Sequence, residues 1–530
     1  RIPATRREAN ATLRGTRTER ISKIERVFMP FDRILVFFDK YLLTFEMPRL
    51  GWSHHRNRDV RGQRMRKSLL VAATALVATS CASLPAYDAG ESLPVTPDSW
   101  TSAPAMTGPY EARDWVESLG DAQLTGLIDE AFQSNPSLNQ SFARYRAARA
   151  AARASGANRL PSLSGGLEYT RSEPNVGSGS DSFSLGLSAS WEADVWGRVA
   201  DGANASARDA QAAAEDVRAS QLSIAGLVAK QWYALTEAHQ QTELAERDVA
   251  TRESSLSLTE RRFARGLVRS SDVRTARSAL ASSEAALASR RRSEAAAARA
   301  LETLLGRYPA AQLVSDGDFP ELDPLAAIGS PEDLLARRPD IRAAERRLEA
   351  AGLRADAARK ALYPSLSLSG GSGTGGPSAE DMLDLDTMVS SLTASLVGPI
   401  FNGGSLRAQR DQAEANAEAQ LHAYVSTVLT AWQEAENALH ADEILEMRVD
   451  SLRQAFEEAA EAEQLVIRQY ASGVATIFDL LNAQSRRISA ESQYISARRD
   501  RATNRVDLYL AIAGDFSAAQ SADPAALTGE

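Results

Sequence analysis

Residues 183–195 read Phe-Ser-Leu-Gly-Leu-Ser-Ala-Ser-Trp-Glu-Ala-Asp-Val, and their regular alternation is the clearest indication of the fold. Apolar side chains alternate with small or polar ones, which predicts a β-strand whose two faces meet different surroundings. The earlier residues Leu163, Leu167 and Tyr169 predict the partner strand of a hairpin, with a Gly/Ser-rich turn over residues 176–181. The first half of the chain is therefore expected to contain one hairpin with an apolar and a polar face.

The second half of the chain repeats these features about 205 residues later. Leu366 and Leu368 lie on one alternating segment and Leu392, Ala394 and Leu396 on another, so a second hairpin is expected. Four short markers also recur in the same order: Asn135-Pro136 as Arg338-Pro339, Leu160-Pro161-Ser162-Leu163 as Tyr363-Pro364-Ser365-Leu366, Val195-Trp196-Gly197 as Ile400-Phe401-Asn402-Gly403-Gly404, and Phe263-Ala264-Arg265-Gly266 as Tyr470-Ala471-Ser472-Gly473. We predict an internally duplicated chain whose two copies each hold a helix, a strand hairpin and a very long helical hairpin.

Long helices make up most of the chain. Residues 201–263 and 406–470 contain no proline, and about sixty helical residues extend roughly 90 Å. Shorter helices are expected over residues 122–134 and 137–157. A heptad seam follows the last turn, at Phe478, Leu481, Ser485, Ile488, Ser492, Ile495, Arg499, Ala502, Val506, Tyr509 and Ala513. Helices of this length must pack lengthwise, so the chain is expected to be mainly α with coiled-coil contacts.

Composition excludes several classes of function. The 530 residues carry a net charge of −9 without a sustained basic face, which argues against nucleic acid as a partner. A lone cysteine, Cys81, excludes a disulfide framework, and the five histidines lack the spacing of metal ligands. Residues 371–376 match a dinucleotide fingerprint, but Pro377 and a polar run follow instead of a helix, so we interpret them as a flexible hairpin tip. We expect no enzyme, no metal and no cofactor.

The N-terminal region resembles a bacterial lipoprotein signal. Met65-Arg66-Lys67 is basic, residues 69–77 are apolar, and Cys81 follows where such signals place a lipidated cysteine. The alternative is a buried cysteine in an ordinary helix. We interpret residues 65–80 as the signal peptide and residues 81–110 as a lipidated, extended linker. Residues 1–64 are then an over-extended translation or a disordered leader, and 516–530 are a flexible tail.

Four strands cannot close a barrel, and open sheet edges do not occur in lipid. If the apolar face meets a membrane, several copies must pool their strands, and three copies would supply twelve. The alternative is a small soluble sheet with one packed face.

The two helical hairpins end in similar turns. Gly266-Leu267 and Gly473-Val474 each stop a long helix, and Asp272 or Asp479 follows a few residues later. An acid there caps the next helix, and this explains Asp272. For Asp479 a second hypothesis stays open, in which symmetry-related copies ring the end of a tube and filter or gate ions.

These markers resemble the outer-membrane factor family of TolC-like proteins, and within it the NodT-type efflux outer-membrane lipoproteins. The resemblance covers about residues 81–515. The matching stretches are Trp115 with Leu119-Gly120-Asp121, Leu127 to Leu138, Trp191 to Arg198, Arg337 to Ile341, Tyr363-Pro364, Phe401 to Gly404 and Tyr470 to Gly473.

The resemblance implies a homotrimer in the bacterial outer membrane, with a covalent palmitate-type lipid on Cys81 and no cofactor. A twelve-stranded membrane β-barrel would continue into a long periplasmic α-helical barrel, built from repeats over residues 111–310 and 311–515. The molecule would be a passive exit channel that an inner-membrane efflux pump reaches through a periplasmic adaptor.

The resemblance also assigns roles to residues at the helix turns. Tyr470 and Asp479 would form the periplasmic constriction, and the turns at Gly266, Leu267, Gly473 and Val474 would dock the adaptor. The family's gate arginine and second aspartate are replaced here, by Ala475 and Asn482. Two alternatives remain open: a lipid-anchored periplasmic coiled-coil scaffold or adaptor, and the exit duct of a type I protein secretion system.

Overall fold

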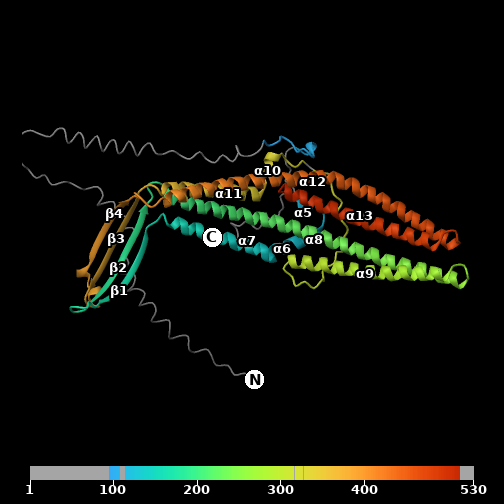
Figure 1. Cartoon of the computed structure of the whole chain (residues 1–530), viewed down its shortest axis with the longest axis horizontal. Helices are drawn as coiled ribbons and strands as arrows, with labels where there is room; N and C mark the ends of the chain where they lie inside the picture. Colours follow the sequence, from blue (N-terminus) through green and yellow to red (C-terminus); the bar gives the residue numbers. More distant parts are fainter. Residues whose placement is uncertain (1–94, 108–113, 316, 326, 514–530) are drawn as a thin grey trace, which may run out of the picture. The chain divides into compact units, whose positions relative to one another are not determined.

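The computed structural model describes residues 95–107, 114–315, 317–325 and 327–513, all of which belong to one compact unit, Ser83–Glu530. Two successive sets of elements have the same order (Figure 1). The first set is α7 (Pro136–Ala157), β1 (Ser162–Ser172), β2 (Ser180–Ala193), α8 (Arg198–Ala264) and α9 (Ser270–Leu304). The second is α11 (Pro339–Lys360), β3 (Ser365–Gly376), β4 (Val389–Val397), α12 (Ser405–Ser472) and α13 (Ile477–Ala511). Short helices flank them: η1 (Pro104–Met106), α5 (Trp115–Ser118), α6 (Ala122–Ser134), α10 (Pro331–Arg337), η2 (Asp381–Leu383) and η3 (Leu385–Thr387).

The structure confirms the predicted strands and helices of both halves. In the part of the chain that it describes, no helix is both long enough and apolar enough to cross a lipid bilayer. The predictions for residues 1–80, for Cys81 and for the tail 516–530 concern residues outside the described part, so they stay predictions.

The shorter helices stack end to end into long rods beside α8 and α12. Helix α7 continues α9, because the Asn135 side chain donates from Nδ2 to the carbonyl of Leu304 (2.7 Å). Helix α11 continues α13 in the same way, because Arg338 donates from Nη1 to the carbonyl of Ala511 (3.1 Å). The carbonyls at a helix end lack partners within the helix, and these side chains supply them. The repeated Asn-Pro and Arg-Pro markers are therefore the joints between stacked helices.

Local chemistry fixes the joint between α9 and α7. Pro136 occupies the first position of α7, where a missing N–H costs nothing, and Asn135 Oδ1 accepts the N–H groups of Ser137 (2.8 Å) and Leu138 (3.1 Å). Gly306 follows α9 with a φ of 73°, and a Cβ there would lie 2.7 Å from the carbonyl oxygen of Ser134. Only glycine allows the two helix ends to approach this closely.

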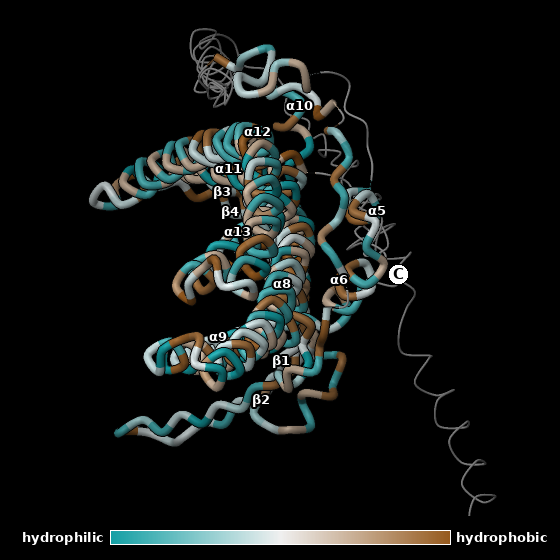
Figure 2. Tube along the Cα trace, turned by 90° about the vertical axis from the view of Figure 1, so that its right-hand side faces the viewer, coloured by the Kyte–Doolittle hydropathy of each residue, from teal (hydrophilic) through white to brown (hydrophobic). Residues whose placement is uncertain are grey.

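The rods form a four-membered helical array. Helix α8 packs against α7 and α9 on one side and against α11 and α13 on the other, and α12 packs against α11 and α13. One edge of the array is therefore α7 with α9, and the other edge is α12. The short helices α5, α6 and α10 lie together on one face of the array (Figure 2).

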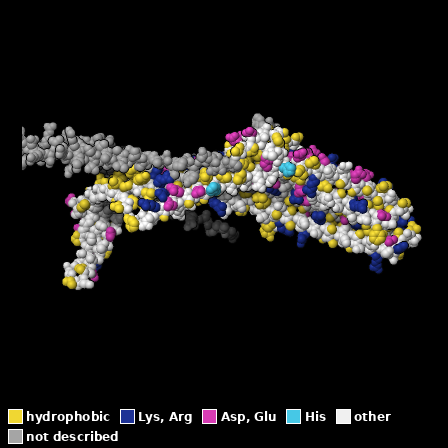
Figure 3. Space-filling view, turned by 45° about the horizontal axis from the view of Figure 1, so that its top comes forward, with side chains coloured by type: hydrophobic (Ala, Val, Ile, Leu, Met, Phe, Trp, Pro, Cys, Tyr) yellow, Lys and Arg dark blue, Asp and Glu magenta, His cyan; other side chains and the backbone are white. Residues whose placement is uncertain are grey.

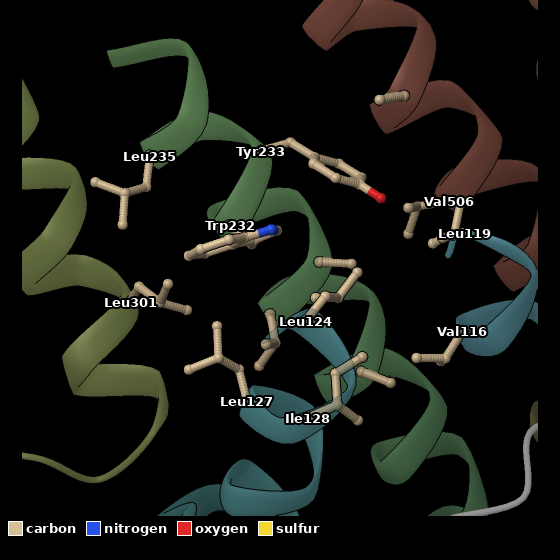
Figure 4. Packing of buried hydrophobic residues seen from close by; sticks show 14 of the residues in the cluster. Val116, Leu119, Leu124, Leu127, Ile128, Trp232, Tyr233, Leu235, Leu301 and Val506 are labelled. Carbon is tan, nitrogen blue, oxygen red and sulfur yellow. The ribbon is translucent and has the colours of Figure 1, made fainter. Parts of the chain in front are cut away.

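Two buried clusters attach these short helices. Figure 4 shows Leu124, Leu127 and Ile128 of α6 pointing toward Trp232 of α8, and the Trp232 indole donates to Asp121 Oδ2 (2.7 Å). A second cluster surrounds Trp100, which is 1% exposed and donates to the carbonyl of Gly329 (2.8 Å). Trp100, within the segment predicted to be an extended linker, is therefore packed against the fold at this indole.

A ladder of ion pairs joins α8 to α11. At four places an acidic residue of α8 meets a basic residue of α11: Asp201 with Lys360, Asp209 with Arg354, Glu215 with Arg342, and Asp216 with Arg347. One further pair, Arg208 of α8 with Glu349 of α11, has the opposite polarity. Charged side chains of both signs cover the helices, whereas few lie on the sheet (Figure 3). This polarity difference separates the molecule into a charged helical part and a nearly uncharged sheet.

The predicted seam of α13 is correct only in its second half. Ile495, Ala502 and Val506 are buried as predicted. Nearer the turn the buried side chains are Ile477, Leu480, Gln484 and Arg487, each one residue before the predicted position. A straight α-helix drifts by about 20° per heptad against a 3.5-residue repeat, so a strict heptad loses its register by one residue over five heptads.

Replacing Asn135 with Ala should lower the free energy of unfolding by about 1–3 kcal/mol, because it removes a helix cap and leaves the Leu304 carbonyl without its donor. Thermal unfolding of the detergent-solubilised protein measures this. Asn139→Ala is the matched control, because the Asn139 side chain is exposed on the same helix. Equal melting temperatures for the two variants would contradict the role of the joint.

Candidate functional site

The sheet gives the first candidate site. Its strands are antiparallel in the order β1-β2-β3-β4, and the register places the alternating apolar residues of all four strands on one face. Leu163 and Leu167 are 71% exposed on this face, and Leu392 is 74% exposed. The members of the apolar face are Leu163, Leu167, Tyr169, Phe183, Leu185, Leu187, Ala189, Trp191, Ala193, Leu366, Leu368, Leu392, Ala394 and Leu396. At the far ends of β3 and β4 the same face carries Ser372, Thr374 and Ser390.

The opposite face of the sheet is polar. Serine pairs cross from β1 to β2, with Ser162 Oγ 2.8 Å from Ser190 Oγ and Ser164 Oγ 3.0 Å from Ser188 Oγ. The outer strands β1 and β4 each have one paired neighbour among the described residues. The sheet thus has one apolar face, one hydroxyl-rich face and two edges with unpaired N–H and C=O groups.

Residues 371–376 correct one sequence interpretation. They were expected to form a flexible hairpin tip, but they lie within β3 and pair with β2. A Cβ at Gly373 would lie 2.9 Å from the carbonyl oxygen of Leu185, and one at Gly375 would lie 2.7 Å from that of Phe183. The glycines allow close approach of neighbouring strands, which a turn-forming interpretation of Gly-rich sequence misses.

The marker after β2 connects the sheet rigidly to α8. The Asp194 carboxylate accepts the N–H groups of Val199 (3.1 Å) and Ala200 (2.7 Å) and so caps the helix. The Trp196 indole donates to the carbonyl of Pro364 (2.6 Å), at the start of β3. Strand hairpins and long helices therefore meet at a fixed joint.

The helix turns give the second candidate site. Gly266 and Gly473 have φ values of 73° and 90°, as expected for glycines that end helices. Leu267 and Val474 are 62% and 78% exposed at the turns, and Phe478 is exposed beside the second turn. Apolar side chains at both turns are thus free to contact another molecule.

Tyr470 is buried where the two turns meet. Its hydroxyl lies 2.9 Å from Thr259 Oγ1 of α8, and its ring lies 4.8 Å beneath the Arg262 guanidinium. Arg262 also donates to the carbonyl of Tyr470. Tyr470 therefore links α12 to α8 within one chain; the sequence alone gave no signal for Thr259 or Arg262 as its partners.

Asp479 caps α13. Its carboxylate accepts the hydroxyl (2.7 Å) and N–H (2.8 Å) of Thr476, and these two hydrogen bonds hold the pKa of Asp479 below its usual range. Asp272 accepts the N–H of Arg269 (3.1 Å) at the equivalent place on α9. Capping is thus present at both turns, and a gating role of Asp479 stays a prediction.

The two turns differ in charge. Four arginines of the first turn, Arg261, Arg265, Arg269 and Arg274, form no ion pair with a described residue, whereas the second turn carries only Arg468 nearby. The first turn is therefore a basic surface around Leu267, and the second is an almost neutral surface around Val474.

Neither the clusters nor the hollows resemble a catalytic centre. Among the described residues, no group of three His, Cys, Asp or Glu side chains is placed to hold a metal ion. A hollow of about 680 Å³ lies at the joint of α11 and α13, but its charges are paired, Lys230 with Asp507 and Arg338 with Glu434.

A sheet with a bare apolar face, joined to helical hairpins of this length, defines the class of outer-membrane channel proteins. The family model described as outer membrane efflux protein matches residues 127–307 and 330–514, so the chain belongs to this family. It is an outer-membrane efflux channel protein and not an enzyme.

Individual relatives agree with this assignment. Outer membrane protein OprJ of Pseudomonas aeruginosa is 32% identical over 84% of this chain and 95% of its own length. The antibiotic efflux pump outer membrane protein ArpC of Pseudomonas putida is 29% identical over 85% of this chain and 96% of its own. The open-state structure of the MtrE outer membrane channel of Neisseria gonorrhoeae is 31% identical, with a TM-score of 0.72 over 82% of this chain and 98% of that one.

The cap at Asp479 predicts a pH dependence. Because hydrogen bonding lowers the pKa of this carboxyl in the folded state, its stabilising effect is present above about pH 4 and disappears as the pH falls through the lowered pKa. Asp479→Asn should lower the melting temperature at pH 7, and the difference from the parent should shrink below pH 4. Glu457→Gln, an exposed acid on α12, is the control; a pH-independent difference for Asp479→Asn would contradict the capping account.

Proposed function

We propose that the protein is the outer-membrane exit duct of a tripartite efflux system, which carries small molecules from an inner-membrane pump through a periplasmic adaptor to the outside. The observation that carries this proposal is the continuous chain of a sheet with one bare apolar face, a rigid joint and helices of 67 and 68 residues. The sheet has the polarity needed between lipid and water, and the helices are long enough to reach far into the periplasm.

Three copies would pair the strand edges that a single chain leaves unpaired. Pooling four strands from each of three chains gives a twelve-stranded barrel in which every edge strand finds a partner. The four-membered helical arrays of three copies would likewise close into a periplasmic α-helical barrel. The repeated order of elements supports an origin by internal duplication, with repeats over residues 111–310 and 311–515.

The partners are assigned to the two ends of the molecule. A lipid on Cys81 would anchor the chain in the outer membrane, and the exposed Leu267 and Val474 beside Gly266 and Gly473 would receive the adaptor. Tyr470 and Asp479 would form the constriction, with the Tyr470–Thr259 bond holding the hairpins together in the closed state. A relative named for antibiotic efflux supports small molecules over proteins as cargo.

Leu187→Arg tests the proposed lipid face. Leu187 is 58% exposed on the apolar face, and an arginine near the bilayer midplane costs about 2–4 kcal/mol per copy. The variant should lose its outer-membrane trimer, measured by heat-modifiable migration of membrane fractions on gels, and should not restore drug resistance to a deletion strain.

Ser188→Arg is the matched control, because the neighbouring side chain lies on the hydroxyl-rich face. It should assemble and retain most of the transport. Normal assembly of Leu187→Arg would show that this face does not meet lipid.

Asp479→Ala tests the constriction. If three Asp479 carboxylates ring the pore, the variant should alter single-channel conductance and reduce block by cations in planar lipid bilayers. A conductance and cation block equal to those of the parent would leave Asp479 as a helix cap only.

A further inference from the structure

The two edges of the helical array carry opposite charge. Helix α12 holds thirteen acidic residues and five arginines. At the other edge, α7 holds four arginines and no acidic residue, and α9 holds six arginines and four acidic residues. A basic edge and an acidic edge on one molecule favour the joining of one copy's α12 to the next copy's α7 and α9.

Some charged residues on these edges are exposed and form no ion pair within the described part of the chain, whereas Asp411 and Arg453 of α12 are exposed but lie close to Arg410 and Asp450 of the same helix. Arg146 and Arg153 of α7 and Arg292 of α9 belong to the first group at the basic edge. Glu418 and Glu443 of α12 belong to it at the acidic edge. These side chains are therefore available to a partner outside the chain.

Contacts between α8 and α13 inside the chain provide a template for the register of the joint in the half of the array nearer the helix turns. Helix α8 meets α13 through Glu237 with Arg499 (3.3 Å) and Arg247 with Glu491 (2.5 Å). One repeat later, α12 takes the place of α8, and α9 of the next copy takes the place of α13.

In the other repeat, the residue equivalent to Glu237 is Ile444 of α12, and the residue equivalent to Arg499 is Arg292 of α9. Glu443 is the neighbour of Ile444. For the second pair the equivalent residues are Gln454 of α12 and Glu284 of α9, and Arg453 is the neighbour of Gln454. An opposite charge therefore lies within one residue of each contact position.

The sign of the charge on α12 reverses between these two positions, from Glu443 to Arg453, and the sign on α9 reverses with it, from Arg292 to Glu284. A general excess of acid on one edge does not explain a matched reversal. The match favours this register over a slide of roughly eight residues, which would bring Glu443 opposite Glu284 in one direction or Arg453 opposite Arg292 in the other.

The ladder of ion pairs between α8 and α11 provides the template for the register of the joint in the half of the array nearer the sheet. Three of its rungs, moved by one repeat, place Ala408, Asn416 and Ala423 of α12 against Ala157, Ala151 and Arg144 of α7. Between the first two rungs lie Asp411 and Arg153, and between the second and third lie Glu418 and Arg146. Both are again pairs of opposite charge.

We propose that α12 of one copy docks against α7 and α9 of the next copy in a register set by four ion pairs: Arg153 with Asp411, Arg146 with Glu418, Glu284 with Arg453, and Arg292 with Glu443. This proposal rests on the proposed ring of identical chains. It adds which helices of neighbouring copies touch and how these helices are aligned along their length. Exposed ion pairs contribute little affinity but strongly discriminate against wrong alignments.

Apolar contact supplies the affinity of the joint. Ile444, Met447 and Leu465 of α12 are 45%, 55% and 49% exposed. The exposed small residues of α9 that would receive them are Ala281, Ala285, Ala288 and Ala296. Large side chains on one helix and alanines on the other permit close packing along the whole contact.

A charge exchange tests the pairing of Arg292 with Glu443. In the full-length detergent-purified protein, Arg292→Glu and Glu443→Arg should each lower the trimer fraction several-fold at low salt, and the double variant should restore it. Arg291→Glu is the matched control, because Arg291 pairs with Glu246 inside the chain. Failure of the double variant to recover, with both single variants impaired, would overturn the pairing.

A cysteine cross-link tests the register directly. Gln241 of α8 contacts Ser492 of α13 (3.0 Å), and their counterparts in the joint are Arg448 of α12 and Ala285 of α9. Arg448→Cys with Ala285→Cys, oxidised with copper phenanthroline, should give covalent trimers on a non-reducing gel, whereas Arg448→Cys with Ala281→Cys should give few.

The outcomes separate this proposal from the function on which it rests. Trimers that cross-link at Ala281→Cys but not at Ala285→Cys, or at neither, overturn the register and leave the exit duct intact. A folded protein that stays monomeric overturns the register and the ring together.

Discussion

The unpaired edges of the four-stranded sheet are the constraint on which the rest of the structure depends. Strands β1 and β4 each have one neighbour among the described residues, so one row of N–H and C=O groups on each is unsatisfied. In lipid such groups cost several kcal/mol each, so an apolar sheet of this kind is stable there only when its edges close on other strands. The exposed apolar face and the unpaired edges therefore both support the proposed closed assembly of several chains.

Hydrogen bonds at helix ends join the helices into rigid rods and connect these rods to the sheet. Asn135 and Arg338 join short helices into rods, and Asp194 caps α8 directly below the sheet. Because these joints fix the rods relative to the strands, the angle at which strands leave the helices is set by hydrogen bonds and not by a flexible linker. In the proposed ring, closure at the sheet would therefore be accompanied by closure at the helices, with the acidic α12 of one copy beside the basic α7 and α9 of the next.

Periodicity in the sequence was sufficient to predict the elements. Alternation of apolar residues located β2, and the absence of proline located α8 and α12, because both signals arise from local backbone geometry. The exposed face containing Leu163 and Leu187 followed from the same alternation. Charge and turn chemistry were also local enough to identify Gly266, Gly473 and the cap at Asp479.

Contacts between distant elements could not be predicted in this way. The bond from Tyr470 to Thr259 joins residues far apart in the chain, and the burial of Trp100 depends on a loop more than two hundred residues later. The heptad of α13 lost its register because the true helical period is not 3.5 residues. The glycines of β3 were mistaken for a turn, because the need for close strand approach is invisible until the register with β2 is known.

Hydrogen–deuterium exchange of the sheet amides in the assembled protein shows whether neighbouring chains pair the edges of the sheet. If neighbouring chains pair the edges, the amides of β1 and β4 should exchange as slowly as those of β2 and β3. Rapid exchange confined to β1 and β4, in a sample whose inner strands are protected, would show that the edges are open and would contradict the closed assembly.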